Sequence, residues 1–303
     1  MNQQLYDGLC QAAGREQVLV DERMDRHTTF RIGGPADFFV IPETIEQLAQ
    51  TVRICREQKV PFYILGNGSN LLVGDKGYRG VIIQVYKNLN AVHTDGQVIS
   101  AQAGAMLSVI AKQALAHGLA GFEFASGIPG TLGGAVVMNA GAYGGEMKDI
   151  IRKVTVLTPE GKIQTIPGDQ MEFGYRTSIV EKKSLIVLSA VIELENGNSE
   201  EIRSRMEELK RKRTSRQPLE LPSAGSTFKR PQGYFAGKLI MDAGLQGFTV
   251  GGAQVSEKHC GFVVNRGGAS AADVRELMRQ VTEKVQERFG VTLEPEVKML
   301  GEF

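Results

Sequence analysis

The sequence predicts an α+β protein with a larger body of many short strands and a smaller α/β domain after it. Apolar runs of strand length recur through the first two thirds of the chain, without the regular strand–helix alternation of a doubly wound sheet. The polar stretch ENGNSEE, which follows Leu194, then marks a boundary. Because 303 residues are long for one core, we expect two domains, residues 1–195 and 196–303.

The elements of the body follow from apolar spacing. Residues 43–58 predict a helix, with Leu48 and Val52 on its apolar face, and Leu107–His117 predict a second that stops at Gly118. We place His93 at a strand edge. The predicted strands are 60–65, 71–73, 81–85, 98–103, 154–157, 163–166 and 185–194.

Residues 196–303 are predicted to form two helices and several short strands. Asn198 or Ser199 can cap a helix that runs to about Arg216, and its basic run KRKR (210–213) favours a solvated face. A last helix begins at Ser270, with Asp273 placed as in a capping box, and ends at Gly290.

Composition narrows the function. With 35 basic and 34 acidic residues the net charge is +1, so no overall field attracts nucleic acid or an anionic membrane, and any anion must be held locally. The start of the chain lacks a signal-peptide h-region, no apolar run approaches a membrane span, and three scattered cysteines fit a reducing cytoplasm. Nothing indicates a protein partner or a metal site. Glycine is abundant, at 36 residues.

Two glycine loops suggest an anion site. In the first, Gly66, Asn67, Gly68, Ser69 and Asn70 follow a predicted strand, which suits either a plain tight turn or a nest of backbone amides. The second loop, GIPGTLGG (127–134), leads into the small apolar run AVVM and resembles a helix start that offers free amides to a diphosphate. The first loop leads into a strand, so it is not a Rossmann fingerprint. Together the loops favour a dinucleotide.

Ser226, in SAGSTFKR (223–230), has three possible roles: a hydrolytic nucleophile, a phosphate ligand, or a helix cap or proton donor. The second glycine of G-x-S-x-G is missing and none of the four histidines lies in a triad context, which disfavours hydrolysis. The nearby GYFAGK (233–238) has too few residues between its glycines for a P-loop.

Six motifs, in order along nearly the whole chain, resemble the UDP-N-acetylenolpyruvoylglucosamine reductases of cell-wall peptidoglycan precursor synthesis. They are TTFRIGGPAD (28–37), LGNGSNLLV (65–73), ASGIPGTLGGAVVMNAGAYGGE (125–146), YRTS (175–178), SAGSTFKRP (223–231) and LEPEVKMLG (293–301). The resemblance implies an FAD-binding fold of the vanillyl-alcohol-oxidase type, with subdomains of roughly 1–85 and 86–195. It also implies a C-terminal domain that holds the UDP-sugar.

For the cofactor, the resemblance implies non-covalent FAD, with NADPH as the reductant. The implied FAD-binding residues are Gly66, Asn67, Gly68, Ser69, Asn70, Gly127, Ile128, Pro129, Gly130, Gly133, Gly134, Ala135 and Asn139. Many oxidases of this fold attach flavin through His or Cys, and neither glycine loop contains one. An alcohol oxidase of the same fold and a non-catalytic nucleotide-binding module are the competing classes.

For catalysis, the resemblance implies Arg176, Ser226 and Glu296. Hydride that arrives at the enolpyruvyl methylene carbon pushes charge into the neighbouring carboxylate, which Arg176 can bind through its planar guanidinium. Glu296 helps a developing anion only when it carries a proton. Ser226 would then donate a proton to the α-carbon.

The substrate diphosphate is less well assigned. Longer family members carry a tyrosine in an inserted segment between the arginine and serine motifs, whereas here only 49 residues separate Arg176 from Ser226. This spacing resembles the shorter subtype. The alternative diphosphate ligands are Tyr175, Lys229, Arg230, Lys238 and His259.

Overall fold

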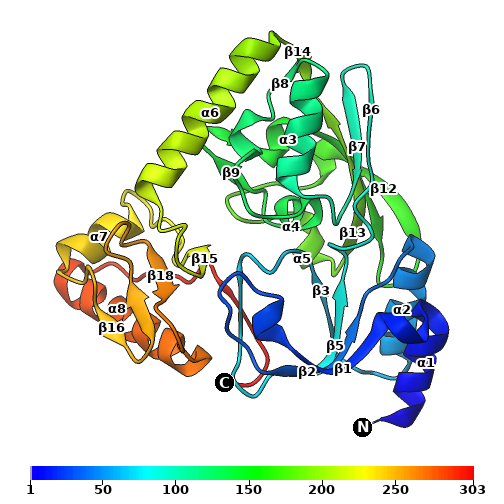
Figure 1. Cartoon of the computed structure of the whole chain (residues 1–303), viewed down its shortest axis with the longest axis horizontal. Helices are drawn as coiled ribbons and strands as arrows, with labels where there is room; N and C mark the ends of the chain where they lie inside the picture. The colour runs from blue at the N-terminus through cyan, green and yellow to red at the C-terminus, as the bar shows by residue number, and fades with distance from the viewer. Residues whose placement is uncertain (1) are drawn as a thin grey trace. The chain divides into compact units, whose positions relative to one another are not determined.

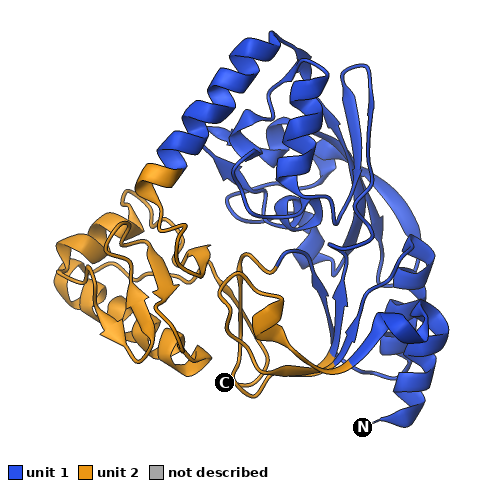
Figure 2. Ribbon diagram, in the orientation of Figure 1, with its two compact units in different colours: residues 1–19, 38–67, 81–213 blue, residues 20–37, 68–80, 214–303 orange. Residues whose placement is uncertain are grey.

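The computed structural model describes residues 2–303, which divide by their contacts into two compact units (Figure 2). Unit 1 comprises Met1–Leu19, Phe38–Asn67 and Val81–Arg213; unit 2 comprises Val20–Asp37, Gly68–Gly80 and Thr214–Phe303. The chain therefore enters unit 2 twice before it remains there from Thr214. In this division, most of the helix that follows the polar stretch stays with unit 1.

Two helices cover the first core of unit 1. α1 (Gln3–Ala13) and α2 (Ile45–Glu57) lie against each other (Figure 1), and Asn2 and Thr44 cap their N-termini through side-chain oxygens. The core beneath them includes Leu9 and Leu48, both fully buried. The helix expected at 43–58 is confirmed; α1 was not foreseen.

Four strands form a sheet in the order β1-β2-β5-β3. Their bounds are β1 (Val18–Arg23), β2 (Pro35–Val40), β5 (Tyr78–Gln84) and β3 (Phe62–Leu65). In unit 1, β3 runs parallel to β5, with Leu65 opposite Gln84. The first glycine loop therefore begins at the carboxyl end of an edge strand.

Unit 1 also contains a five-stranded antiparallel sheet in the order β12-β11-β13-β7-β6. Its strands are β12 (Ile163–Pro167), β11 (Ile151–Leu157), β13 (Ile186–Glu193), β7 (Val98–Gln102) and β6 (Val92–Asp95). Two short pairs accompany it: β8 (Leu119–Ala120) with β14 (Glu195–Asn196), and β9 (Gly141–Ala142) with β10 (Gly145–Glu146). His93 lies on β6, an edge strand, as predicted.

Unit 1 also contains α3 (Leu107–Ala116), α4 (Leu132–Val137), α5 (Ile179–Lys182) and most of α6 (Ser199–Arg216). His117 caps α3, and Gly118 follows with a φ of 65°. The Asn198 side chain accepts from the amides of Glu200 and Glu201, so it begins α6 as expected.

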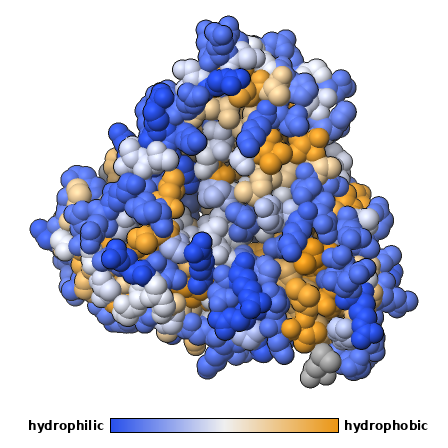
Figure 3. Space-filling view, in the orientation of Figure 1, coloured by the Kyte–Doolittle hydropathy of each residue, from blue (hydrophilic) through white to orange (hydrophobic). Residues whose placement is uncertain are grey.

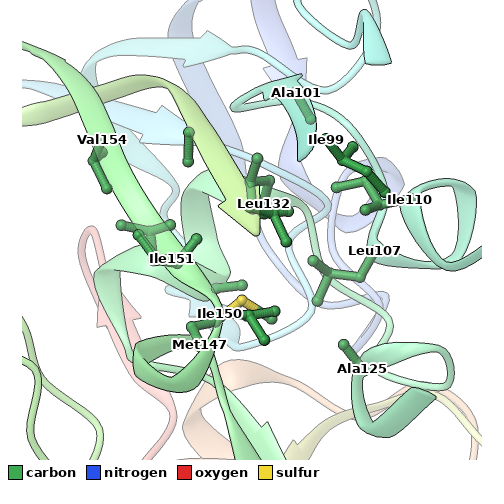
Figure 4. Packing of buried hydrophobic residues seen from close by; sticks show 14 of the residues in the cluster. Ile99, Ala101, Leu107, Ile110, Ala125, Leu132, Met147, Ile150, Ile151 and Val154 are labelled. Atoms are coloured by element: carbon green, nitrogen blue, oxygen red, sulfur yellow. The ribbon is translucent and has the colours of Figure 1, made fainter. Parts of the chain in front are cut away.

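The short helix α4 is fixed by the core under the five-stranded sheet. Figure 4 shows Leu132 among buried side chains from the sheet and from α3, including Ile99 and Ile110. All three side chains are fully buried. This packing holds the end of the second glycine loop in place.

Unit 2 contains an antiparallel sheet in the order β15-β18-β17-β16. Its strands are β15 (Ser223–Ser226), β18 (Phe262–Asn265), β17 (Ala253–Val255) and β16 (Thr249–Val250). The unit also has α7 (Ala236–Asp242), α8 (Ala271–Phe289) and a parallel pair formed by β4 (Leu71–Val73) and β19 (Lys298–Leu300). The capping box of Ser270 with Asp273 and the left-handed Gly290, with a φ of 68°, confirm the predicted ends of α8.

Single 3₁₀ turns connect several of these elements, at Arg15–Gln17, Met24–Arg26, Glu123–Ala125, Met147–Asp149 and Gly168–Gln170. The face drawn in Figure 3 is mostly hydrophilic, with hydrophobic residues between the polar ones. Among residues 2–303, no helix is both long and apolar enough to cross a membrane.

Candidate active site

Within unit 1, the start of the first glycine loop touches the second. The Asn67 side chain donates from Nδ2 to the carbonyl of Pro129 at 2.8 Å. A Cβ on Gly66 would overlap the hydroxyl of Thr131, which is buried. Only glycine fits at Gly66 without moving Thr131, so the two loops form one surface.

The second loop offers fewer free amides than its sequence suggests. The amides of Leu132 and Gly133, at the start of α4, already donate to the carbonyls of Ala105 and Ala103, each at 2.8 Å. A Cβ on Gly133 would lie 2.9 Å from that of Ala103, so this glycine serves close packing. The amides of Leu132 and Gly133 are therefore not free, although the sequence predicted free amides at this helix start. Gly134 is exposed and its nearest neighbour is Thr131.

The rest of the first loop belongs to unit 2. Gly68 has a φ of 63°, and a Cβ there would overlap the carbonyl of His27. The Asn70 side chain donates to the carbonyl of Glu296 at 3.1 Å, and the Asn70 carbonyl accepts from Lys298 at 3.0 Å. Asn70 thus holds the segment that carries Glu296, a contact that the sequence alone did not indicate.

Arg176 lies in a strained turn. Gly174 and Thr177 bond to each other through both backbone pairs, which leaves Tyr175 and Arg176 as the two central residues of a tight turn. Arg176 has a φ of 54°, a conformation that costs a non-glycine residue about 1 kcal/mol or more. Its guanidinium lies 5.1 Å from the centroid of the Tyr175 ring. This strain falls on a residue that the sequence predicts to be catalytic.

Asn139 anchors this turn. Its side chain is buried and donates to the carbonyl of Gly174 at 3.1 Å and to Oε2 of Glu146 at 2.9 Å. Its oxygen accepts from the amide of Lys148. Both amide hydrogens are thus used inside the protein, so the Asn139 side chain supports this turn.

Glu146 adds negative charge near the turn that carries Arg176. The Lys148 ammonium, at 2.9 Å, is the main cause that holds the pKa of Glu146 below its usual value, and the charge of Arg176 contributes in the same direction. Ser178 ties the far side of the turn to α4, because its hydroxyl donates to the carbonyl of Val137 at 2.9 Å. The sequence did not indicate that Asn139 and Ser178 anchor the turn, although Asn and Ser side chains commonly bond to nearby backbone.

In unit 2, a bulge directs Ser226. Ser223 pairs with Val264 and Ser226 with Phe262, so β15 has one residue more than its partner strand, and Gly225 takes a φ of 76°. Bulges of this kind re-aim a side chain. Ser226 is exposed, and its hydroxyl has no hydrogen-bond partner within residues 2–303. It therefore caps no helix and is paired with no histidine base.

The backbone brings Glu296 beside Ser226. The amide of Glu296 donates to the carbonyl of Thr227, the residue after Ser226, at 2.8 Å. Phe228 and Pro295 continue the pairing as an antiparallel bridge. Glu296 is half-buried. The structure therefore places two of the three expected catalytic residues on adjacent segments of one unit.

The basic side chains expected near the substrate diphosphate have protein partners. Lys229 forms an ion pair with Glu294 at 3.2 Å, and Lys238 forms one with Asp242 at 2.8 Å. The Arg230 guanidinium lies 3.9 Å from the centroid of the Phe235 ring, an exposed aromatic.

The pKa of His259 is shifted by its surroundings. Burial lowers its pKa, which favours the neutral imidazole. Nδ1 accepts from the amide of Gly261 at 3.1 Å, so the neutral ring carries its proton on Nε2. His259 can therefore donate one hydrogen bond. Within residues 2–303, no three His, Cys, Asp or Glu side chains gather in a way that could hold a metal ion.

Two family models match the chain. One, described as an FAD binding domain, matches residues 36–167, and the other, the C-terminal domain of UDP-N-acetylenolpyruvoylglucosamine reductase, matches residues 217–300. The UDP-N-acetylenolpyruvoylglucosamine reductase of Clostridioides difficile is 54% identical over 301 residues, which cover 99% of each chain. The chain belongs to the UDP-N-acetylenolpyruvoylglucosamine reductase family.

Further relatives agree with this family. The UDP-N-acetylenolpyruvoylglucosamine reductase of Caldanaerobacter subterraneus is 53% identical over 98% of each chain. The crystal structure of the Thermus caldophilus enzyme of the same name matches with a TM-score of 0.79 and 37% identity, over 93% of this chain and 98% of that one. The chain is thus an FAD oxidoreductase of the UDP-N-acetylenolpyruvoylglucosamine reductase family, with the predicted FAD-binding fold.

The residues of unit 1 fit the diphosphate of FAD. The exposed Gly134 leaves the start of α4 open to a ligand, because a Cβ there would meet only the Thr131 hydroxyl, at 3.8 Å. Neither the start of the first loop, 66–67, nor the second, 127–135, contains an acidic side chain that would repel phosphate. The structure thus agrees with the predicted cofactor.

Proposed function

We propose that this protein reduces UDP-N-acetylglucosamine enolpyruvate to UDP-N-acetylmuramate with NADPH, in peptidoglycan precursor synthesis. The observation that carries the proposal is that the amide of Glu296 donates to the carbonyl of Thr227, the residue after the exposed Ser226, so that Ser226 and Glu296 lie on adjacent segments of unit 2. When bound, FAD supplies the hydride chemistry, from NADPH to the methylene carbon of the enolpyruvyl group. The residues of the chain bind the reactants, orient them and move the proton.

For the cofactor, we propose that residues 1–195 bind FAD non-covalently and that residues 196–303 bind the UDP-sugar. The FAD diphosphate lies against residues 66–70 and 127–135 in this proposal. Gly130 and Gly134 permit close approach of the phosphates in this proposal, and Gly134 has open space on its Cβ side, whereas Gly66, Gly133 and Asn139 maintain the shape of the loops. A side chain at Gly66 would collide with Thr131, so this glycine keeps the two loops in contact.

Arg176 binds the substrate carboxylate in this proposal. Negative charge develops there as hydride reaches the methylene carbon, and a planar guanidinium can donate two parallel hydrogen bonds to it. The strained backbone of Arg176 and the anchors at Asn139 and Ser178 support this role, because they fix the turn before the reaction.

Ser226 donates the proton to the α-carbon. A hydroxyl of high pKa suffices because the acceptor carbon is strongly basic. The O–H bond of Ser226 breaks and a C–H bond forms, after which the alkoxide regains a proton from water. Glu296, in its protonated form, hydrogen-bonds to the substrate carboxylate. Hydride and proton together account for the two hydrogens gained by the product.

The UDP-sugar diphosphate is bound by a subset of Tyr175, Lys229, Arg230, Lys238 and His259. We favour His259, because it retains a donor on Nε2, whereas Lys229 and Lys238 already form ion pairs. We also place the protein in the cytoplasm: Cys10, Cys55 and Cys260 are free thiols, which suit a reducing compartment.

The test is a reaction of the purified protein with NADPH and the UDP-enolpyruvyl sugar. We expect NADPH oxidation that depends on the sugar and a product heavier by two hydrogens. NADPH oxidation by oxygen alone, with the enolpyruvyl sugar unchanged, would contradict the proposal and favour an oxidase of the same fold.

A further inference from the structure

The last turns of α6 contain a basic side chain that differs from its neighbours. Lys210, Arg211 and Lys212 are exposed, as the sequence predicted for the KRKR run. Arg213 is instead half-buried. The prediction of a solvated face is therefore wrong for this one residue.

Arg213 lies on the first glycine of the second loop. A Cβ on Gly127 would be 3.2 Å from Cδ of Arg213, 3.8 Å from Nη1 and 4.0 Å from Nε. Both the aliphatic stem and the guanidinium thus cover the backbone of Gly127. Any larger residue at Gly127 would push the guanidinium away from the loop.

The charge of Arg213 is not balanced by the protein. Within residues 2–303 it has no hydrogen bond or ion pair, whereas Arg205 and Arg279 on exposed helix faces pair with glutamates. Burial is the main cause that lowers the pKa of Arg213, and the nearby phenol of Tyr143 acts in the opposite direction. A desolvated cation without a counter-ion is unfavourable, so a ligand anion would stabilise it.

We propose that Arg213 binds a diphosphate at the second glycine loop and that this diphosphate belongs to FAD. The inference rests on the proposed position of FAD. Glycine backbone supplies space for the phosphates but little positive charge, and the guanidinium of Arg213 supplies that charge with paired donors. The UDP-sugar also carries a diphosphate, so the experiment separates the two ligands.

The experiment compares Arg213→Met, Arg213→Lys and the control Arg203→Met, an exposed arginine of the same helix. FAD content and the Kd for FAD are measured by dialysis of the purified holoenzyme, and KM for the UDP-enolpyruvyl sugar by steady-state kinetics. Losing hydrogen bonds to a charged group typically weakens binding about tenfold to hundredfold. We expect that loss in FAD affinity for Arg213→Met, a smaller one for Arg213→Lys, and none for Arg203→Met.

A second readout excludes a purely structural role. The FAD-free Arg213→Met protein should unfold at the same temperature as FAD-free wild type or higher, because a desolvated charge has been removed. A variant that loses stability without FAD would overturn the proposal. So would unchanged FAD affinity, or a raised KM for the UDP-sugar alone, which would assign Arg213 to the substrate. If wild type itself binds no FAD, the proposed function fails together with this inference.

Discussion

Asn139 donates a hydrogen bond from Nδ2 to the carbonyl of Gly174 at 3.1 Å. The bond joins the residues after α4 to the tight turn that presents Arg176. Since α4 begins at the second glycine loop, the proposed cofactor loop and the proposed catalytic arginine are held by one short run of unit 1. The position of Arg176 therefore depends on a residue that touches no reactant in this account.

Replacement of Asn139 by alanine should affect both stability and catalysis. The change removes three hydrogen bonds of a buried side chain and leaves alanine with a positive φ, so unfolding should cost roughly 2–4 kcal/mol less. Urea unfolding and kcat measure the two effects. Asn196→Ala, on the exposed β14, is the control and should change neither. A stable Asn139→Ala variant with normal kcat would show that Asn139 does not hold the Arg176 turn in place.

Arg176→Lys should be severe although it keeps the charge. Lysine lacks the planar fork that matches a carboxylate, so kcat should fall about 10²-fold or more. The measurement is kcat at saturating UDP-enolpyruvyl sugar. Arg152→Lys, which keeps an exposed pair with Glu193, should retain full turnover. Near-normal kcat in Arg176→Lys would show that Arg176 does not bind the substrate carboxylate during the reaction.

Gly133 and Gly134 should respond differently to alanine. At Gly133 the new methyl would press on Ala103, so the protein should lose about 1–3 kcal/mol of stability. At Gly134 the space is open, and alanine in a helix should gain about 0.5–1 kcal/mol while it obstructs FAD. Thermal unfolding of the FAD-free proteins and FAD titration separate the effects. Equal behaviour of the two variants would show that α4 is not the surface that FAD approaches.

His259 should make the protein less stable in acid. Burial lowers its folded pKa below the unfolded value of about 6.5, so the unfolded chain binds a proton first as pH falls. The stability that neutral His259 contributes is complete above the unfolded pKa and is lost as pH falls toward the folded one. His259→Gln should flatten the loss of stability, measured by urea unfolding, between about pH 7 and pH 5. The exposed His117→Gln is the control; identical slopes for all three proteins would be contrary to this expectation.

Local patterns predicted much of the fold. The boundaries of α2, α3 and α8 follow from apolar spacing and caps such as Ser270 and Gly290, which act within a few residues. The helix α1 was overlooked although Leu5 and Leu9 give it an apolar face. It packs against α2, which is distant in sequence.

The site was harder to predict than the fold. Motif order indicated Arg176, Ser226 and Glu296, but the contacts that hold them come from residues far apart in the chain. Asn70 bonds to Glu296, and Asn139 to Gly174, with no sequence signal for either pairing. Arg213 was hidden within a basic run, since composition cannot show that one of four charges is desolvated.

The most direct test of the proposed reaction is anaerobic stopped-flow on Ser226→Ala, with flavin absorbance followed in each half-reaction. Bleaching by NADPH should be nearly normal, because it requires no proton from Ser226. Return of the absorbance on mixing with the UDP-enolpyruvyl sugar should slow by about 10²–10⁴-fold, the usual loss for a general acid. Ser226→Cys, which keeps a protonated donor, should recover part of that rate. If Ser226→Ala regains its absorbance at the wild-type rate, the proton comes from another group and the proposed role of Ser226 is wrong.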